Sequence, residues 1–190
     1  MPVEPLFDIS NIDHDRPVMG QDDIAAWIPH RGPIFMLDAV LHIDDPPTRA
    51  VALVNIPEHP WWADGHIPGQ PLMPGVLQVE AAAQLSSLVY HIRSQRTWFA
   101  GFTRINDVSF RGQVKPGDQL VLLCLGVKYS LKRFVTRVQG LVDGSVVMEG
   151  QLSGMVFPQM GDQVERAPFN PADQPTHSAN ADIVHRTPTT

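Results

Sequence analysis

The chain has 190 residues, of which 43% are hydrophobic and 18% charged, and its formal net charge at pH 7 is −6. These values indicate one compact folded domain and exclude a collagen-like, coiled-coil or wholly disordered chain. The 14 Lys and Arg residues form no dense run, which argues against binding to duplex nucleic acid, because that needs clustered cations. A single cysteine, Cys124, excludes an internal disulfide and a Cys-based zinc site.

The sequence predicts a cytoplasmic protein that is neither exported nor inserted into a membrane. Its longest unbroken apolar run is far shorter than the roughly 18 residues that a membrane helix needs. The first twenty residues hold four carboxylates instead of the basic start and apolar stretch of a signal peptide.

The two ends of the chain are predicted to contribute little to the core. Residues 158–190 hold five prolines and few apolar residues, too little apolar surface to offset the entropy of ordering the chain, so we expect a disordered tail. Residues 1–20 look similar and are predicted to be a flexible segment. The folded domain is therefore expected at 21–157.

The first half of that domain alternates short elements with turns. A short amphipathic helix is predicted at 24–28 and ends at Pro29. Strand-like runs follow at 35–43 and 49–56, separated by the turn formers at 44–47. Five prolines then fall within 57–74 and predict a stiff loop without regular structure.

The second half begins with a long helix. Residues 75–93 are rich in Ala and Leu and apolar on nearly every face, so we expect a helix that is buried all round. Four strand-like runs follow at 98–110, 119–128, 131–142 and 145–157, the last two joined by the hairpin signal Asp143-Gly144. This order predicts an α+β architecture in which an antiparallel sheet wraps around a long central helix. An unpaired edge strand in such a sheet favours a dimer at least.

Three chemical features gather at the start of the long helix. Glu80 is a lone carboxylate in an apolar helix, where burial without a partner would cost several kcal/mol. His66 lies on the loop that the prolines stiffen, and Gly75 stands where free backbone N–H groups at a helix N-terminus favour a developing oxyanion. A base, an acid and an oxyanion site suit removal of a proton beside a thioester carbonyl with loss of a β-hydroxyl. A surface glutamate and an ordinary loop histidine are the simpler alternative.

Three segments carry a family resemblance. The stretch GHIPGQPLMPGVLQVEAAAQ at 65–84 resembles the active-site signature of the Z-type bacterial 3-hydroxyacyl-acyl-carrier-protein dehydratases of the hotdog fold. The segments IPHRGPIFMLD at 28–38 and FRGQVKPGDQL at 110–120 are similar to two further motifs of that family. The resemblance covers roughly residues 21–157.

This resemblance implies a hotdog fold and dehydration of (3R)-3-hydroxyacyl thioesters on acyl carrier protein to trans-2-enoyl thioesters, without a cofactor or metal. His66 corresponds to the catalytic histidine of the family and Glu80 to its catalytic acid. Gly75, followed by Val76, corresponds to the helix N-terminus that binds the thioester oxygen. The family pairs the histidine of one subunit with the acid of the other, which implies a homodimer and often a trimer of dimers.

Some positions depart from the family pattern and leave the substrate and carrier contacts open. They are Gln70, Ala39, Gly112 and the pair Trp61-Trp62. The hotdog fold also carries acyl-thioesterases and non-catalytic acyl-thioester-binding proteins, which stay as alternatives.

Other candidate residues have structural interpretations as well as functional ones. Phe99 and Phe102 are candidates for lining an acyl tunnel, with core packing as the alternative. A basic patch that steers an acidic carrier protein is predicted from Arg111, Lys115, Lys132 and Arg133. His30 with Asp38 is expected to support the fold near the site. The histidines show no metal-ligand spacing.

Overall fold

The protein is described by a computed structural model, which covers residues 3–96 and 98–157. Within this range one antiparallel sheet has the strand order β1-β2-β4-β5-β6-β3. The strands are β1 (Ala39–Ile43), β2 (Arg49–Asn55), β3 (Ala100–Phe110), β4 (Gln119–Tyr129), β5 (Arg133–Val142) and β6 (Ser145–Val156). The helices are α1 (Gln21–Trp27), α2 (Ala63–His66), α3 (Gly75–Ser94) and a 3-10 turn, η1 (Gly32–Ile34). The predicted tail at 158–190 lies outside the described residues.

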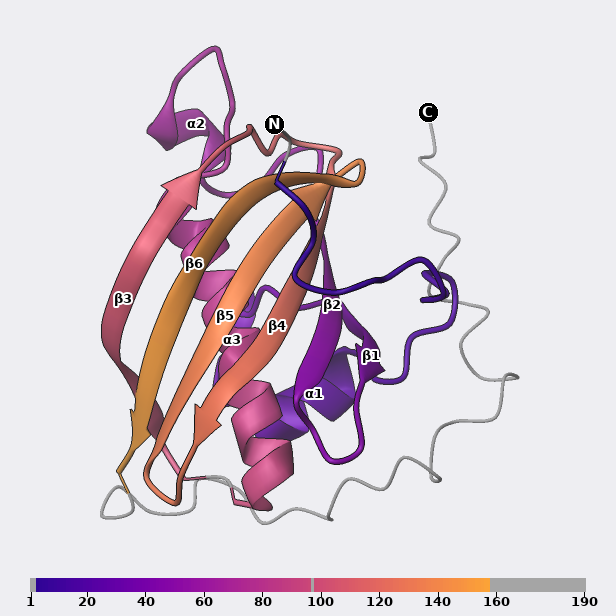
Figure 1. The fold of residues 1–190 in the computed structure, drawn as a ribbon. Coiled ribbons are helices and arrows are strands. Elements are labelled where there is room, and N and C mark those ends of the chain that lie inside the picture. Colours follow the sequence, from indigo (N-terminus) through magenta and orange to yellow (C-terminus); the bar gives the residue numbers. More distant parts are fainter. Residues whose placement is uncertain (1–2, 97, 158–190) are drawn as a thin grey trace.

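Helix α3 fills the concave face of the sheet (Figure 1). Leu85 and Leu88 are fully buried and belong to a large apolar cluster that also includes residues of five strands. The helix ends where Gln95 adopts a left-handed φ of 52°, a common helix stop. These features confirm the predicted α+β architecture. The first turn differs from the prediction, because Val76 is 74% exposed and the helix is therefore not buried all round.

Two predicted elements change near the site. Strand β1 begins at Ala39, not at residue 35, because Gly32–Ile34 forms a 3-10 turn closed by the hydrogen bond from Phe35 N to Gly32 O. The proline-rich loop contains a single helical turn, α2, which was not predicted. The prolines flank this turn and leave its four residues free to form it.

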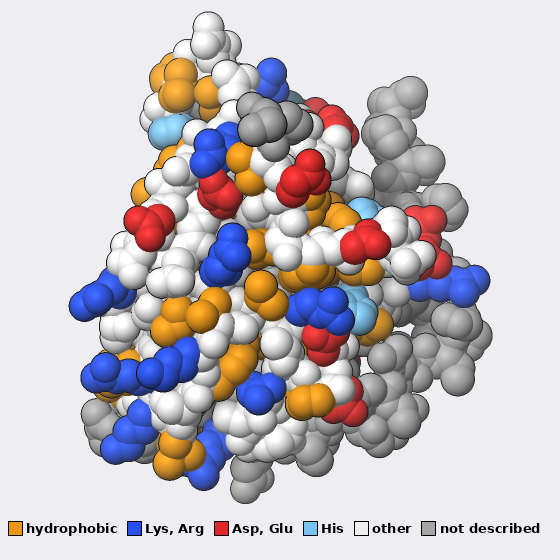
Figure 2. All heavy atoms as spheres, viewed as in Figure 1, with side chains coloured by type: hydrophobic (Ala, Val, Ile, Leu, Met, Phe, Trp, Pro, Cys, Tyr) orange, Lys and Arg blue, Asp and Glu red, His pale blue; other side chains and the backbone are white. Residues whose placement is uncertain are grey.

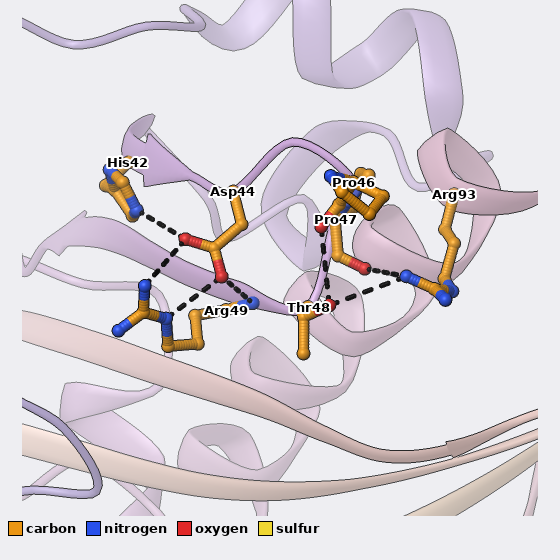
Figure 3. A network of polar contacts seen from close by, with 7 residues as sticks. All are labelled: His42, Asp44, Pro46, Pro47, Thr48, Arg49 and Arg93. Carbon is orange, nitrogen blue, oxygen red and sulfur yellow. Dashed lines mark hydrogen bonds and ion pairs between the residues drawn. The ribbon is translucent and has the colours of Figure 1, made fainter.

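The β1–β2 turn is fastened to the C-terminal end of α3 (Figure 3). The Asp44 carboxylate accepts two hydrogen bonds from the Arg49 guanidinium, at 2.9 and 3.2 Å, and lies 3.0 Å from His42 Nε2. Partial burial acts to raise the pKa of Asp44, but the bonds from Arg49 and His42 outweigh it and lower that pKa. Arg93 of α3 donates to the carbonyl oxygen of Pro47 at 2.8 Å.

The convex face of the sheet carries a second apolar cluster, which α3 does not touch. We call it the outer cluster; its members are Leu41, Val51, Leu53, Val121, Leu123 and Leu141, each at most 9% exposed. Residues 3–19, here the arm, cross this face on the side opposite α3 (Figure 1). Leu6, Phe7, Ile9 and Ile12 of the arm pack on the outer cluster. The few apolar side chains of the arm thus meet a matching apolar face, and the flexibility expected of residues 1–20 stays a prediction.

Candidate active site

His66 is the last residue of α2 and is held by the loop that follows it. Its Nδ1 lies 3.0 Å from the carbonyl oxygen of Leu72. A carbonyl only accepts hydrogen bonds, so Nδ1 must carry the proton and Nε2 of the neutral ring keeps its lone pair. The next residue, Met73, donates its N–H to Val114 O at 2.8 Å, which ties the loop to the segment before β4. The exposed imidazole is thus oriented as a proton acceptor.

Glu80 lies on α3 about one turn after the helix begins, and Gln84 fixes its carboxylate. Gln84 Nε2 donates to Glu80 Oε1 at 2.9 Å and to Ile34 O at 2.7 Å. Gln84 Oε1 accepts the Met36 N–H at 3.1 Å, which fixes the orientation of the amide. One carboxylate oxygen is thereby held, while the side chain stays 27% exposed. A buried glutamine four residues after an acid on a helix is the sequence signal that could have found this contact.

His30 is the second neighbour of Glu80, with its Nε2 3.4 Å from Oε1. Burial lowers the pKa of His30, although the Glu80 charge opposes this effect, so the ring is neutral at pH 7. Its Nδ1 is buried and has no hydrogen-bond partner among the described residues. The predicted grouping with Asp38 differs from this arrangement, because that carboxylate accepts from Asn55 N and Gln21 Nε2 instead.

The N-terminus of α3 offers two backbone donors. Leu77 N and Gln78 N bind Pro74 O, whereas the first two amides, of Gly75 and Val76, have no acceptor within the helix. The ring of Phe110 lies directly over Gly75, so close that a Cβ on this residue would be 2.7 Å from the ring. The absence of a side chain at position 75 therefore lets the ring approach the helix end.

Within one chain, His66 and Glu80 have different polar partners. Among the described residues His66 binds Leu72 O, whereas Glu80 binds Gln84 and lies close to His30, and no hydrogen bond or ion pair joins His66 to Glu80. Gly75 is on the same helix as Glu80 and comes shortly before it.

The register puts the two tunnel candidates on opposite faces of the sheet, because Phe102 shares the face of Gly154, whereas Phe99 lies beside Gly101, which is opposite Met155. Phe102 is 41% exposed and sits opposite Gly154 of β6. The ring of Phe99 packs against that of Phe157, with their centroids 5.9 Å apart.

The predicted basic patch is divided between the two ends of the sheet. Arg111 and Lys115 follow the end of β3, whereas Lys132 and Arg133 lie at the turn before β5. The register places them about seven residues apart along β6, or roughly 20 Å. Arg111 also forms a short ion pair with Glu149, which lowers the pKa of that carboxyl.

Residues 28–151 match a family model described as the FabA-like domain. The chain belongs to the FabA-like family. A 3-hydroxyacyl-[acyl-carrier-protein] dehydratase FabZ of Acetivibrio thermocellus is 38% identical to this FabA-like chain over 131 residues, which are 68% of this chain and 89% of that protein. The corresponding protein of Protochlamydia amoebophila is 33% identical over 147 residues, 77% of this chain and 95% of its own length.

A solved structure supports the hotdog fold of this FabA-like chain. The dehydratase heterocomplex ApeI:P of Xenorhabdus doucetiae superimposes with a TM-score of 0.62 at 15% identity, over 72% of this chain and 92% of the other. Among the residues that the structure describes, no helix has the length and apolar character needed to span a membrane. In the same residues no group of three or more His, Cys, Asp or Glu side chains is placed to hold a metal ion.

Proposed function

We propose that this FabA-like chain dehydrates 3-hydroxyacyl thioesters of acyl carrier protein to trans-2-enoyl thioesters in fatty acid or related lipid synthesis. His66 Nε2 accepts the α-proton, the electron pair forms the new double bond, and the β-carbon–oxygen bond breaks. Glu80, in its protonated carboxylic acid form, delivers a proton to the leaving hydroxyl, which departs as water. The free amides of Gly75 and Val76 stabilise the charge on the thioester oxygen. The observation that carries this proposal is the Nδ1–Leu72 hydrogen bond, which leaves Nε2 of His66 free to act as the base.

A homodimer would complete the site. Strand β3 is an edge of the sheet and bears three exposed apolar side chains, Phe102, Ile105 and Phe110. Pairing of β3 with β3 of a second copy about a two-fold axis would cover them. It would also place the His66 loop of one copy beside α3 of the other, so we assign His66 and Glu80 of each site to different subunits.

The inner row of β3 is the proposed wall of the acyl tunnel. Ile105 pairs in register with the buried Leu152, so its side chain shares the inner face with Phe102. Phe110 begins this row over Gly75. Phe99 packs on Phe157 beside Gly101, on the other face of β3, and is therefore left out of this row.

An antiparallel dimer would also reunite the basic patch. The end of the sheet with the β4–β5 turn in one copy would lie beside the C-terminal end of β3 in the other. Lys132 and Arg133 of one subunit would then join Arg111 and Lys115 of its partner. Figure 2 shows Lys and Arg side chains gathered over the lower ends of β3, β5 and β6. An acidic carrier protein is the partner that this charge fits. The substitutions Lys132→Glu and Arg133→Glu are expected to raise KM for carrier-linked substrate and to leave KM for short soluble thioesters unchanged. Arg16→Glu on the arm is the control and is expected to change neither KM.

The decisive experiment measures the mass of a 3-hydroxyacyl chain on acyl carrier protein after incubation with the protein. Wild type is expected to remove one water, while His66→Ala and Glu80→Gln are expected to remove none. Release of free carrier thiol in place of water would contradict dehydration and indicate a thioesterase. Binding of the carrier without either reaction would indicate a non-catalytic acyl-binding protein.

Co-expression of the two inactive variants tests the shared site separately. Mixed dimers would hold one site with both groups intact, and random assembly makes half of the dimers mixed. About one quarter of the wild-type activity is therefore expected to return. Absence of any recovery in confirmed mixed dimers would place both groups in the same subunit.

A further inference from the structure

We propose that the arm is a built-in cover that prevents two copies of this chain from associating through the convex faces of their sheets. The arm precedes residues 28–151, the part that matches the family model. This inference concerns assembly alone and does not rest on the proposed reaction.

The outer cluster forms one continuous apolar patch beneath the arm. Val51 lies opposite Leu123 in the register, and Leu53 lies opposite Val121, which in turn lies opposite Leu141. Directly opposed side chains on one face of a sheet are in contact range. Without the arm, these side chains would form an exposed aliphatic patch, which is the usual mark of an association surface.

Away from the arm, the convex face mixes exposed charged side chains with half-buried apolar ones, Leu125 beside Arg137 and Val135 beside Ser153. Arg104 lies opposite Ser153 there, and Arg137 lies opposite Gln151. Arg104 and Arg137 are exposed. The buried apolar cluster of this face thus lies where the arm covers it.

The arm also closes the free edge of the sheet at β1. Val18 N and Met19 N donate to Val40 O, and Val40 N donates to Met19 O. An edge strand with free backbone groups can pair with another chain, and this contact uses those of Val40. The arm therefore blocks both stacking on the convex face and pairing at its edge.

Few polar contacts hold the arm over the outer cluster. Gln139 of β5 accepts the Leu6 N–H at 2.7 Å and donates to Glu4 O at 3.1 Å. The Phe7 ring lies 5.6 Å from the guanidinium of Arg49. Such an attachment can be released by changes in the arm alone, with the sheet left intact.

A second copy of this chain is the occupant that the uncovered face fits best. The outer cluster contains only aliphatic side chains, so it offers a charged partner no counter-charge. Two aliphatic sheet faces pack well on each other, as in sandwich folds. A contact of one face with its own copy closes about a two-fold axis.

The test uses the full chain with Leu6→Ser, Phe7→Ser and Ile9→Ser, which release the arm without altering the sheet. Sedimentation velocity over a range of concentrations compares its mass with that of wild type. We expect the mass to rise about twofold with concentration, because one isologous contact joins two assemblies. The control Asp8→Asn with Ser10→Ala changes only exposed arm positions and is expected to keep the wild-type mass.

Adding Leu123→Gln to the arm-release variant places a polar group in the outer cluster and is expected to restore the wild-type mass. An arm-release variant with a native circular dichroism spectrum and unchanged mass at all concentrations would overturn the proposal. So would a rise in mass that Leu123→Gln does not reverse. If the arm-release variant does not fold, Gln139→Ala is measured by sedimentation velocity instead. A higher mass than wild type would support the proposal that the arm is a cover, and an unchanged mass would overturn it.

Discussion

On each face of the sheet a buried glutamine binds a neighbouring segment of the chain, and the two glutamines have different roles. On the inner side, Gln84 of α3 binds Ile34 and Met36 and also orients the Glu80 carboxylate. On the outer side, Gln139 of β5 binds the arm at Glu4 and Leu6. One glutamine amide therefore links the segment at 34–36 to the candidate catalytic Glu80, and the other holds the arm on the convex face.

The two sides of the sheet differ in how much apolar surface they bury. The inner cluster includes eight buried residues of α3 together with residues of β1, β2, β4, β5 and β6. The outer cluster has six members, covered by four partly buried side chains of the arm. Because apolar burial scales with the area removed from water, the inner layer dominates stability, while the outer layer controls which surface is exposed.

The largest expected effect is on the free energy of unfolding, which substitutions in the inner and outer clusters should lower by different amounts. Leu88→Ala in α3 should lower the free energy of unfolding by about 2–5 kcal/mol, because the rigid helix and sheet cannot close the cavity. Leu123→Ala in the outer cluster should cost less, because the arm can settle into the space. Urea denaturation of both variants measures the difference, and an equal or larger loss for Leu123→Ala would contradict the comparison.

The two glutamines should differ in activity more than in stability. Gln84→Met leaves Ile34 O and Met36 N without their side-chain partner, at a cost of about 1–3 kcal/mol, and frees the Glu80 carboxylate. We expect kcat to fall by about tenfold or more, the equivalent of about 1.4 kcal/mol in the barrier. Gln139→Met is the matched control and should keep kcat. Equal kcat for the two variants would show that Gln84 does not position Glu80.

The aromatic contact of the arm should have a smaller effect. Phe7→Leu keeps an apolar side chain but removes the ring beside Arg49, so the free energy of unfolding should fall by about 0.5–1 kcal/mol. Phe7→Tyr keeps the ring and should retain the wild-type stability. Thermal unfolding of wild type and the two variants tests this. An equal loss of stability in Phe7→Tyr and Phe7→Leu would show that the effect comes from packing and not from the contact between the ring and the Arg49 cation.

The smallest effect is a pH dependence confined to the inner side. Burial lowers the pKa of His30 below 6.5, so below that pH the unfolded chain binds more protons than the folded one. The free energy of unfolding contributed by this group is therefore fully present above pH 6.5 and falls as the pH drops through the folded-state pKa. His30→Asn should lose less stability than wild type between about pH 7 and pH 5. Identical losses in denaturant titrations would contradict a buried neutral histidine.

Local sequence determined most of the elements and the identity of the candidate site. The run of helix formers at 75–93 and the apolar runs of β2, β4, β5 and β6 are contiguous signals, so the helix and these strands were predicted within a few residues. The motif around His66, Gly75 and Glu80 is equally local. It predicts the chemistry at the start of α3 and on the loop before it, and this assignment stays a prediction.

Tertiary structure alone decided what covers each face and which groups meet. Strand β2 is buried on both faces between Ala50 and Val54, and β4 is buried on both faces between Leu120 and Cys124. Their lack of polar alternation is the sequence signal that a second layer exists. Composition did not identify the arm as that layer, since four apolar side chains stabilise it only against a matching surface. The contacts of Gln84 with Ile34 and of His30 with Glu80 join segments about fifty residues apart. Local patterns carry no information about such distant partners, because these depend on how the sheet and helix pack.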